Sequence, residues 1–379
     1  MSELRVRVYN VHFGDAILVT IDEPAGVRRL LIDVGNLLRG KEGAGDDAVF
    51  EPVTRSILTE LAGDPVDLYV LTHEHLDHAQ GLFLAHSRFN LTVPVDRVWL
   101  TASAALDYYD RFKDAEVRKI AEDTFAAAES LALDLDDPVS PLFLNNNPSS
   151  TRQCIDYLRD LANTTEFVFK GKSTSLGSAS LDVLAPEEDS SVYYGTGLAL
   201  APGIAGSPLD AAAVTPPPGV DAGVFADLLA RRRRAVGGNM LAIDKANNNT
   251  SVVLNIEWLG WRLLFPGDAE QASWWSMSEQ HLLAPVHILK VAHHGSWNGT
   301  PPDEILESIL PGDHSPDGRP RYALVSTHRG GYDSVPHQPT LDRIATRAET
   351  LSTLDDDHLW YEVVLADTGT ASVRHGPQI

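Results

Sequence analysis

The sequence predicts an α/β fold, and three observations lead to this prediction. Short apolar segments of strand length alternate with segments of helical periodicity along most of the 379 residues. Hydrophobic residues make up 43% of the chain and charged residues 22%, which is typical of a soluble globular protein. A dense histidine and aspartate cluster, THEHLDH, follows one apolar segment directly, in the kind of loop that carries function in many proteins.

The first hundred residues are expected to form strands with two helices among them. Period-two alternation predicts a strand at 4–11, and continuous apolar runs predict buried strands. These runs lie at 16–21, 28–35 and 66–72, and a further strand is expected at 96–101. Apolar residues at helical spacing predict helices at 51–61 and 79–86.

Two later segments differ in composition and are predicted to be insertions. Residues 102–162 are rich in alanine, leucine and acidic residues at helical spacing, so a helical insertion is expected there, with Cys154 as a buried structural thiol. Residues 190–247 are rich in glycine and proline, which predicts a long loop or lid. Arg231 to Arg234 cannot all share one helix face, so we interpret them as a solvated helix end rather than an anion-binding patch.

The last third of the chain returns to alternating strands and helices. Between the two insertions, strands are expected at 165–170 and 180–185. After them, strands are expected at 250–258, 261–268, 287–294, 322–327 and 360–366, with helices at 269–282, 302–310 and 339–348. The length of the chain allows two or three domains, or one large domain with insertions.

Composition excludes several classes of function. The formal net charge of −23 disfavours a broad duplex-DNA face or an anionic membrane surface as the partner. This charge does not exclude a local basic or metal-bearing cleft that binds a small or single-stranded anionic substrate. A single cysteine rules out a disulfide framework, and no run of about 18 apolar residues predicts a membrane span. The expected location is the cytoplasm, and the oligomeric state is left open.

The strongest chemical signal is His73-x-His75-x-Asp77-His78. In an extended segment, residues i and i+2 point to the same side, so His73 and His75 can both bind one metal ion. The chain then turns into a helix, which lets Asp77 and His78 face a second ion. Imidazole and carboxylate ligands suit zinc, with manganese or iron as the alternatives.

Other candidate site residues also follow predicted strands. Asp268 follows a buried strand in FPGDAE. One of His293 and His294 in VAHHGS is expected to bind metal, while the other points towards substrate or a hydrogen-bond partner. Asp33, at the end of the LLID strand, is expected to orient a ligand rather than bind metal. His337 is a candidate proton donor or substrate contact.

Together these motifs resemble the metallo-β-lactamase-fold hydrolases. NVHFGDAILV, NNNTSVVLNI, LKVAHHGSWNGT and VSTHRGGYDSVPHQPTLDRI narrow the resemblance to the extracellular hydrolase domain of ComEC-type DNA-uptake proteins and their soluble relatives. The resemblance covers roughly residues 4–100, 165–187 and 247–375. It implies a four-layer αββα sandwich, classed as α/β or in some schemes α+β, with a site for two divalent metal ions at the sheet edges. It also implies that the whole chain, 1–379, is one domain that carries the two insertions at 102–162 and 190–247.

One departure from that family concerns the first metal. The family pattern supplies a third histidine between the HxHxDH and GD motifs, whereas here only His86 lies in that interval, on a helix that should point it away. Asn249, Ser251 or a water molecule is expected near the position that the third histidine has in the family. The resemblance then implies one metal held by His73, His75 and Asp268. The second would be held by Asp77, His78, Asp268 and one of His293 and His294.

The expected activity is hydrolysis. Two cations would lower the pKa of a shared water towards neutrality, and the resulting hydroxide would attack a phosphodiester. Asp77 would order this hydroxide, and His337 or the histidine of His293 and His294 that does not bind metal would protonate the leaving group. The substrate would be a nucleotide, a single-stranded nucleic acid or a phospholipid head group. The alternatives are an ester, lactone or amide hydrolase, and a non-catalytic effector whose insertions bind a partner.

Overall fold

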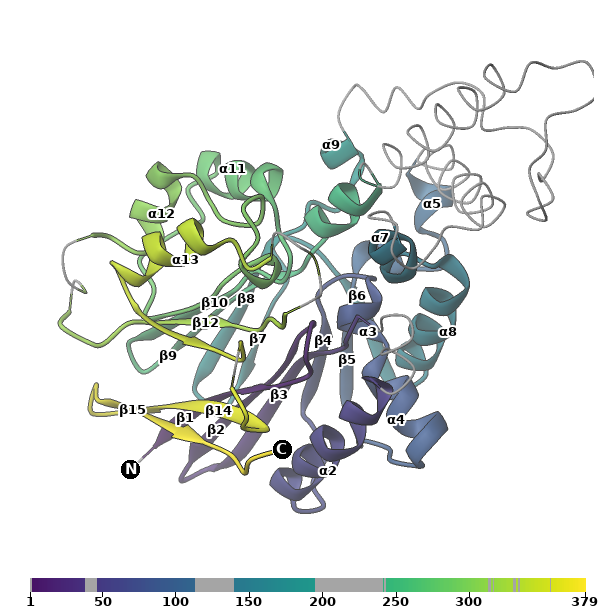
Figure 1. Cartoon of the computed structure of the whole chain (residues 1–379), viewed down its shortest axis with the longest axis horizontal. Helices are drawn as coiled ribbons and strands as arrows, with labels where there is room; N and C mark the ends of the chain where they lie inside the picture. Colours follow the sequence, from purple (N-terminus) through teal and green to yellow (C-terminus); the bar gives the residue numbers. More distant parts are fainter. Residues whose placement is uncertain are drawn as a thin grey trace, which may run out of the picture.

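Two mixed β-sheets form the centre of the molecule (Figure 1). The computed structural model describes residues 2–37, 46–112, 140–194, 241, 243–312, 315, 317–329, 332, 335–354 and 356–379. Much of both predicted insertions, and with it Arg231 to Arg234, lies outside the described residues. The parts of 102–162 that are described form helices and turns, as expected.

The first sheet has eight strands in the order β15-β14-β1-β2-β3-β4-β5-β6. Strands β3 to β6 run parallel, and the remaining neighbours pair antiparallel. The strands are β1 (Glu3–Tyr9), β2 (Ala16–Glu23), β3 (Gly26–Val34), β4 (Leu68–Leu71), β5 (Arg97–Thr101), β6 (Thr164–Val168), β14 (Trp360–Ala366) and β15 (Ala371–His375).

The second sheet has seven strands in the order β13-β12-β11-β10-β9-β8-β7. Strands β10 to β13 run parallel, so their carboxyl ends meet at one edge of the sheet. The strands are β7 (Ser173–Leu176), β8 (Ala179–Ala185), β9 (Val253–Trp258), β10 (Trp261–Phe265), β11 (Ile288–Lys290), β12 (Tyr322–Val325) and β13 (Glu349–Ser352).

Side-chain alternation fixes the layering. On the first sheet, Leu4, Val6 and Val8 point to the space between the sheets, where they meet Leu254 and Leu263 of the second sheet. The intervening positions face outward and pack against helices. The two sheets and the helices on either side of them form four layers, which are separated by one core between the sheets and two outer cores.

The helices cover the two outer faces (Figure 1). The first sheet packs against α2 (Phe50–Leu61), α4 (Gly81–Phe89) and α8 (Pro148–Arg159), and the second packs against α11 (Gln271–Glu279), α12 (Asp303–Ile309) and α13 (Gln338–Ala345). The predicted αββα arrangement is therefore confirmed. Cys154 of α8 is buried in the outer core, as predicted, and burial raises its pKa to about 12.

Several short elements were not predicted. Strands β7, β13 and β15 have half-exposed, serine- and threonine-containing sequences that lack an apolar run. The described part of the chain also contains short helices, of which α3 (Leu76–Ala79) is the expected helical turn after His75. The others are η1 (Asp46–Val49), η2 (Ala102–Ala104), α5 (Tyr108–Arg111), α7 (Ser140–Asn145), α9 (Ser191–Tyr194) and η3 (His293–Gly295). None of the described helices is long and apolar enough to span a bilayer.

Candidate metal centre

Loops after the parallel strands of both sheets bring the predicted ligand-type residues together. His73 to His78 follow β4, Asp268 follows β10, and His294 follows β11. Asp77, His78, Asp268 and His294 are buried, and each offers a ligand atom within 4.8 Å of the others. His73, His75 and Asp77 form a second such group, so Asp77 belongs to both. Asp268, which was expected to be the shared residue, lies only in the first of these groups.

The spacing of the first group suits a common ion. Nε2 of His78 lies 3.3 Å from Oδ1 of Asp268, and Nε2 of His294 lies 3.3 Å from Oδ2 of Asp77 and 3.4 Å from Oδ2 of Asp268. Ligands about 2.1 Å from a tetrahedral ion are separated by roughly 3.4 Å.

Unpartnered polar atoms provide an independent test of this fit. Several buried side-chain atoms that face the cluster have no hydrogen-bond partner; they are Nε2 of His73, His78 and His294 and Oδ1 of Asp77 and Asp268. Buried polar groups are almost always satisfied, so a convergent set of orphans indicates a missing partner. These residues therefore fit divalent metal ions.

Two histidines are oriented by hydrogen bonds at their outer nitrogens. Nδ1 of His78 lies 2.8 Å from Oδ2 of Asp33, and the same carboxylate accepts from the backbone and hydroxyl of Thr72. Nδ1 of His294 lies 2.9 Å from the carbonyl oxygen of Ser326. In each ring the outer nitrogen donates, which leaves Nε2 free to face the cluster.

The two adjacent histidines His293 and His294 have different surroundings. His294 lies in a ligand group, whereas Nε2 of His293 is 3.9 Å from Oδ2 of Asp268 and its Nδ1 is 3.5 Å from Oε1 of Glu270. Both residues have a positive φ, 48° and 52°, in the left-handed region that non-glycine residues rarely adopt. This strained turn directs the two rings to different partners.

Without metal, the cluster is a set of strongly interacting charges. Burial alone would raise the pKa of Asp77, but the charges of His78 and His294 outweigh it and hold the pKa at about 2. Burial would lower the pKa of His294, but Asp268 and Asp77 raise it to about 9. Burial and neighbouring histidines push the pKa of His73 well below its usual value, so this imidazole is neutral and able to bind metal.

A buried ion pair that was not predicted lies behind the cluster. Lys290 of β11 is 1% exposed and pairs with Asp15, and its Nζ lies 3.8 Å from Oδ1 of Asp268. Burial would lower the pKa of this lysine, but the charges of Asp15 and Asp268 raise it. Both residues stand in the motifs that carry the family resemblance, GDAILV and LKVAHH, which is the sequence signal that could have found them.

Glycine allows the turn that carries Asp77 and His78 to approach β3. A Cβ at Gly35 would lie 2.2 Å from the backbone nitrogen of His78, and a Cβ at Gly14 would lie 2.6 Å from the carbonyl oxygen of Asp77. No side chain fits at either position. The turn is therefore held directly on the backbone next to Asp33.

Asn249 and Ser251, which stay predicted neighbours of the position that the third histidine has in the family, form hydrogen bonds with the start of α11 and with the loop of Asp268. Oδ1 of Asn249 accepts from the backbone and hydroxyl of Ser273 at the start of α11. Oγ of Ser251 accepts from the backbone nitrogen of Asp268 at 3.0 Å and so fixes the loop that carries this aspartate.

The side chains that face His75 come from the predicted insertions. Nε2 of His75 lies 2.8 Å from Oδ1 of Asn146, whose amide group donates to Asp244. Oδ1 of Asp244 is 3.7 Å from the same histidine nitrogen. Sequence reasoning missed both residues because their segments lie outside the family resemblance. His86 points away from the cluster, as expected, and its ring stacks on Tyr157.

Glu270 forms a buried polar network beside His293. Its Oε1 accepts hydrogen bonds from Asn248 at 2.9 Å and Asn298 at 2.5 Å. Burial raises the pKa of this carboxyl to about 8. Glu270 was not predicted, although it directly follows the GDA motif.

His337 is not brought into the cluster. Its Nδ1 lies 2.9 Å from Oγ1 of Thr340, and its backbone nitrogen donates to the carbonyl of Gly295. The residue lines a neighbouring cavity of about 490 Å³ together with Trp297, whose side chain is 71% exposed.

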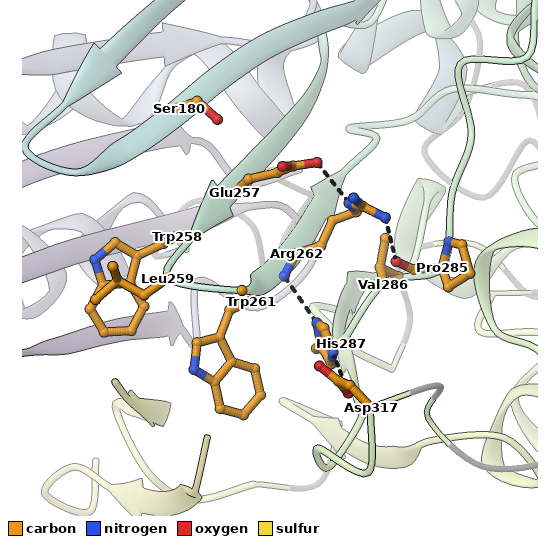
Figure 2. A pocket seen from close by; sticks show the side chains of 11 residues that line it. Ser180, Glu257, Trp258, Leu259, Trp261, Arg262, Pro285, Val286, His287 and Asp317 are labelled. Carbon is orange, nitrogen blue, oxygen red and sulfur yellow. Dashed lines mark hydrogen bonds and ion pairs between the residues drawn. The ribbon is translucent and has the colours of Figure 1, made fainter. Parts of the chain in front are cut away.

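A different pocket, of about 510 Å³, lies at the turn between β9 and β10, at the opposite end of β10 from Asp268 (Figure 2). Its polar side chains are paired with one another. Arg262 donates to Glu257, and His287 lies between the backbone of Arg262 and the carboxylate of Asp317 (Figure 2). No group of ligand-type residues was found there among the described residues.

Comparisons with known proteins find likenesses among solved structures alone. Neither a protein-family model nor a curated protein matches the chain. Among solved structures, the chain is similar to the metallo-beta-lactamase fold protein YhfI from Bacillus subtilis, with 10% sequence identity and a TM-score of 0.38. The match covers 93% of this chain and 96% of that chain. The ComEC-type relationship stays a prediction.

Proposed function

We propose that this protein is a hydrolase that depends on two divalent metal ions, zinc in the first instance, and cleaves phosphodiester bonds. The observation that carries the proposal is the pair of buried ligand groups that share Asp77, with unpartnered nitrogen and oxygen atoms converging on one another. Such a set has a high desolvation cost unless cations compensate it. Bound divalent ions supply Lewis acidity and a water of lowered pKa.

Two divalent ions would balance the charge of the site. The carboxylates there are opposed by the ammonium group of Lys290, which leaves four negative charges with neutral histidines; these carboxylates belong to Asp15, Asp33, Asp77, Asp244 and Asp268. Two divalent ions would neutralise this total. The ions themselves, as the largest local charges, would attract a phosphodiester anion more strongly than a neutral lactone.

The chain's own residues have distinct proposed roles. Asp33 and Ser326 orient His78 and His294, and Lys290 balances the carboxylates behind the site. His293 is the proposed proton donor to the leaving oxygen, through Nε2, because His294 belongs to a ligand group and Glu270 lies beside Nδ1 of His293. His337 and Trp297 line a cavity that can receive the leaving group, which supports a small or single-stranded substrate.

The test is hydrolysis of bis(4-nitrophenyl) phosphate by the zinc-loaded protein, beside a panel of lactones and carboxylic esters. We expect metal-dependent phosphodiester cleavage that Asp268→Ala abolishes and that His281→Ala, a change at an exposed histidine, leaves intact. Faster hydrolysis of lactones or esters than of the phosphodiester would contradict the proposed substrate class and favour an ester or lactone hydrolase. Two bound ions with no hydrolysis of any substrate would contradict the enzymatic role and favour the effector alternative.

A further inference from the structure

A second set of ligand-type residues lies outside the centre described above. Asp356 and His358 stand in the segment between β13 and β14, and His375 is the last residue of β15. Their ligand atoms lie within 4.8 Å of one another. None of the three belongs to the groups around Asp77, and the comparisons and the sequence motifs assign them no role.

The backbone holds these residues in fixed positions. His375 pairs with Tyr361 in the register of β14 and β15, and His358 forms an isolated bridge with Gln378. The carbonyl oxygen of Asp356 accepts a hydrogen bond of 2.8 Å from the side chain of Asn10. Backbone pairing therefore sets the loop and β15 side by side, and the Asp356 carboxylate also accepts a hydrogen bond of 3.0 Å from the backbone nitrogen of His358.

The side-chain geometry leaves room for an ion. Nδ1 of His358 lies 2.7 Å from Oδ1 of Asp356, whereas Nδ1 of His375 lies 3.7 Å from Oδ2, beyond hydrogen-bond reach. The centroids of the two imidazole rings are 5.0 Å apart. One carboxylate thus faces two rings: Oδ1 forms a hydrogen bond with His358, and Oδ2 lies at a distance from His375 that is close to the separation of ligands on a common ion.

We propose that Asp356, His358 and His375 form a separate surface site for a borderline divalent cation of the Zn²⁺, Ni²⁺ or Cu²⁺ class. Two imidazoles and one carboxylate are the donor set that these ions prefer over Mg²⁺ or Ca²⁺. The side chain of His375 is 46% exposed and that of His358 is 33% exposed, so water completes the coordination. An ion there links the segment before β14 to the last strand, and its binding stabilises the folded chain by mass action.

The experiment counts bound ions. The full chain, stripped with a chelator, is titrated with Ni²⁺ by isothermal calorimetry, beside His375→Gln and the control His281→Gln, which changes an exposed histidine elsewhere. We expect His375→Gln to bind one ion fewer than the wild type and His281→Gln to bind the same number. Equal stoichiometry in the wild type and His375→Gln would overturn the proposal.

A second variant keeps the test independent of folding defects. Asp356→Asn keeps an oxygen that can accept from His358 and removes the charge, so we expect at least a tenfold weaker binding of the surface ion. The central ligands are untouched in both variants, so phosphodiesterase activity should persist. A variant that loses the surface ion and keeps full phosphodiesterase activity would support the surface site independently of the proposed function. Unchanged nickel affinity in Asp356→Asn contradicts it.

Discussion

Oδ2 of Asp33 lies 2.8 Å from Nδ1 of His78, and the opposite nitrogen of that ring faces Asp268 at 3.3 Å. The carboxylate thus fixes the tautomer of a candidate metal ligand from behind. Asp33 has a φ of 51°, a region that aspartate and asparagine enter more easily than other non-glycine residues. Asp33→Asn can therefore keep the backbone while it removes the charge.

We expect Asp33→Asn to weaken zinc binding at the central site by about 10–100-fold, the usual effect of losing a partner behind a ligand. Competition with a chromophoric chelator measures this change. The control is Asp22→Asn, which alters an exposed carboxylate on the same sheet. Wild-type affinity in Asp33→Asn would show that His78 does not need this orientation.

Lys290→Met should strongly destabilise the metal-free protein, because it leaves the buried carboxylate of Asp15 without its cation. Breaking a buried pair in this way costs about 3–5 kcal/mol. Urea unfolding of Lys290→Met, Asp15→Asn and the double variant gives the coupling energy. The double variant should be more stable than Lys290→Met alone. If the two losses simply add, the residues do not act as a pair.

Stability of the metal-free protein should fall as the pH rises from about 6.5 to 9. The pKa of His294 is raised from 6.5 to about 9, so its contribution is complete below 6.5 and is lost as the pH passes 9. The pKa of Glu270 is raised from 4.5 to about 8, so this carboxyl lowers stability as the pH rises from 4.5 to 8, a window that overlaps that of His294 between 6.5 and 8.

Urea unfolding in the presence of a chelator, at pH 6.5 and at pH 9, measures the loss. Glu270→Gln should reduce the difference between the two pH values, since it removes one of the two titrating groups. Equal stability at both pH values would contradict these shifts. Metal affinity should change in the opposite direction, because ions compete with protons for the ligand nitrogens.

Gly35→Ala should prevent the turn at Asp77 and His78 from packing on β3, since the added Cβ would lie 2.2 Å from backbone atoms. We expect low yield of folded protein or a loss of stability of several kcal/mol, as for other overpacked sites. Gly312→Ala is the matched control, because the nearest atoms to its Cβ are 3.7 Å away and belong to flexible side chains. Thermal unfolding compares the two variants.

The sequence predicted the central sheets and the ligand cluster because both depend on local patterns. Buried strands such as β4 and β10 are continuous apolar runs, and polar residues after them meet at the carboxyl edges of parallel strands. Edge strands such as β13 were missed because they bury little apolar surface. Asp244 and Asn146 were missed because their proximity to His75 depends on the packing of distant segments, which no local pattern encodes.

The central claim is that the two ligand groups that share Asp77 hold two metal ions. The most direct measurement is an anomalous difference map, recorded at the zinc edge, from crystals of the zinc-loaded protein. We predict one peak among Asp77, His78, Asp268 and His294 and a second peak beside His73 and His75. A map without peaks at these residues, at zinc concentrations that saturate binding in solution, would contradict the account.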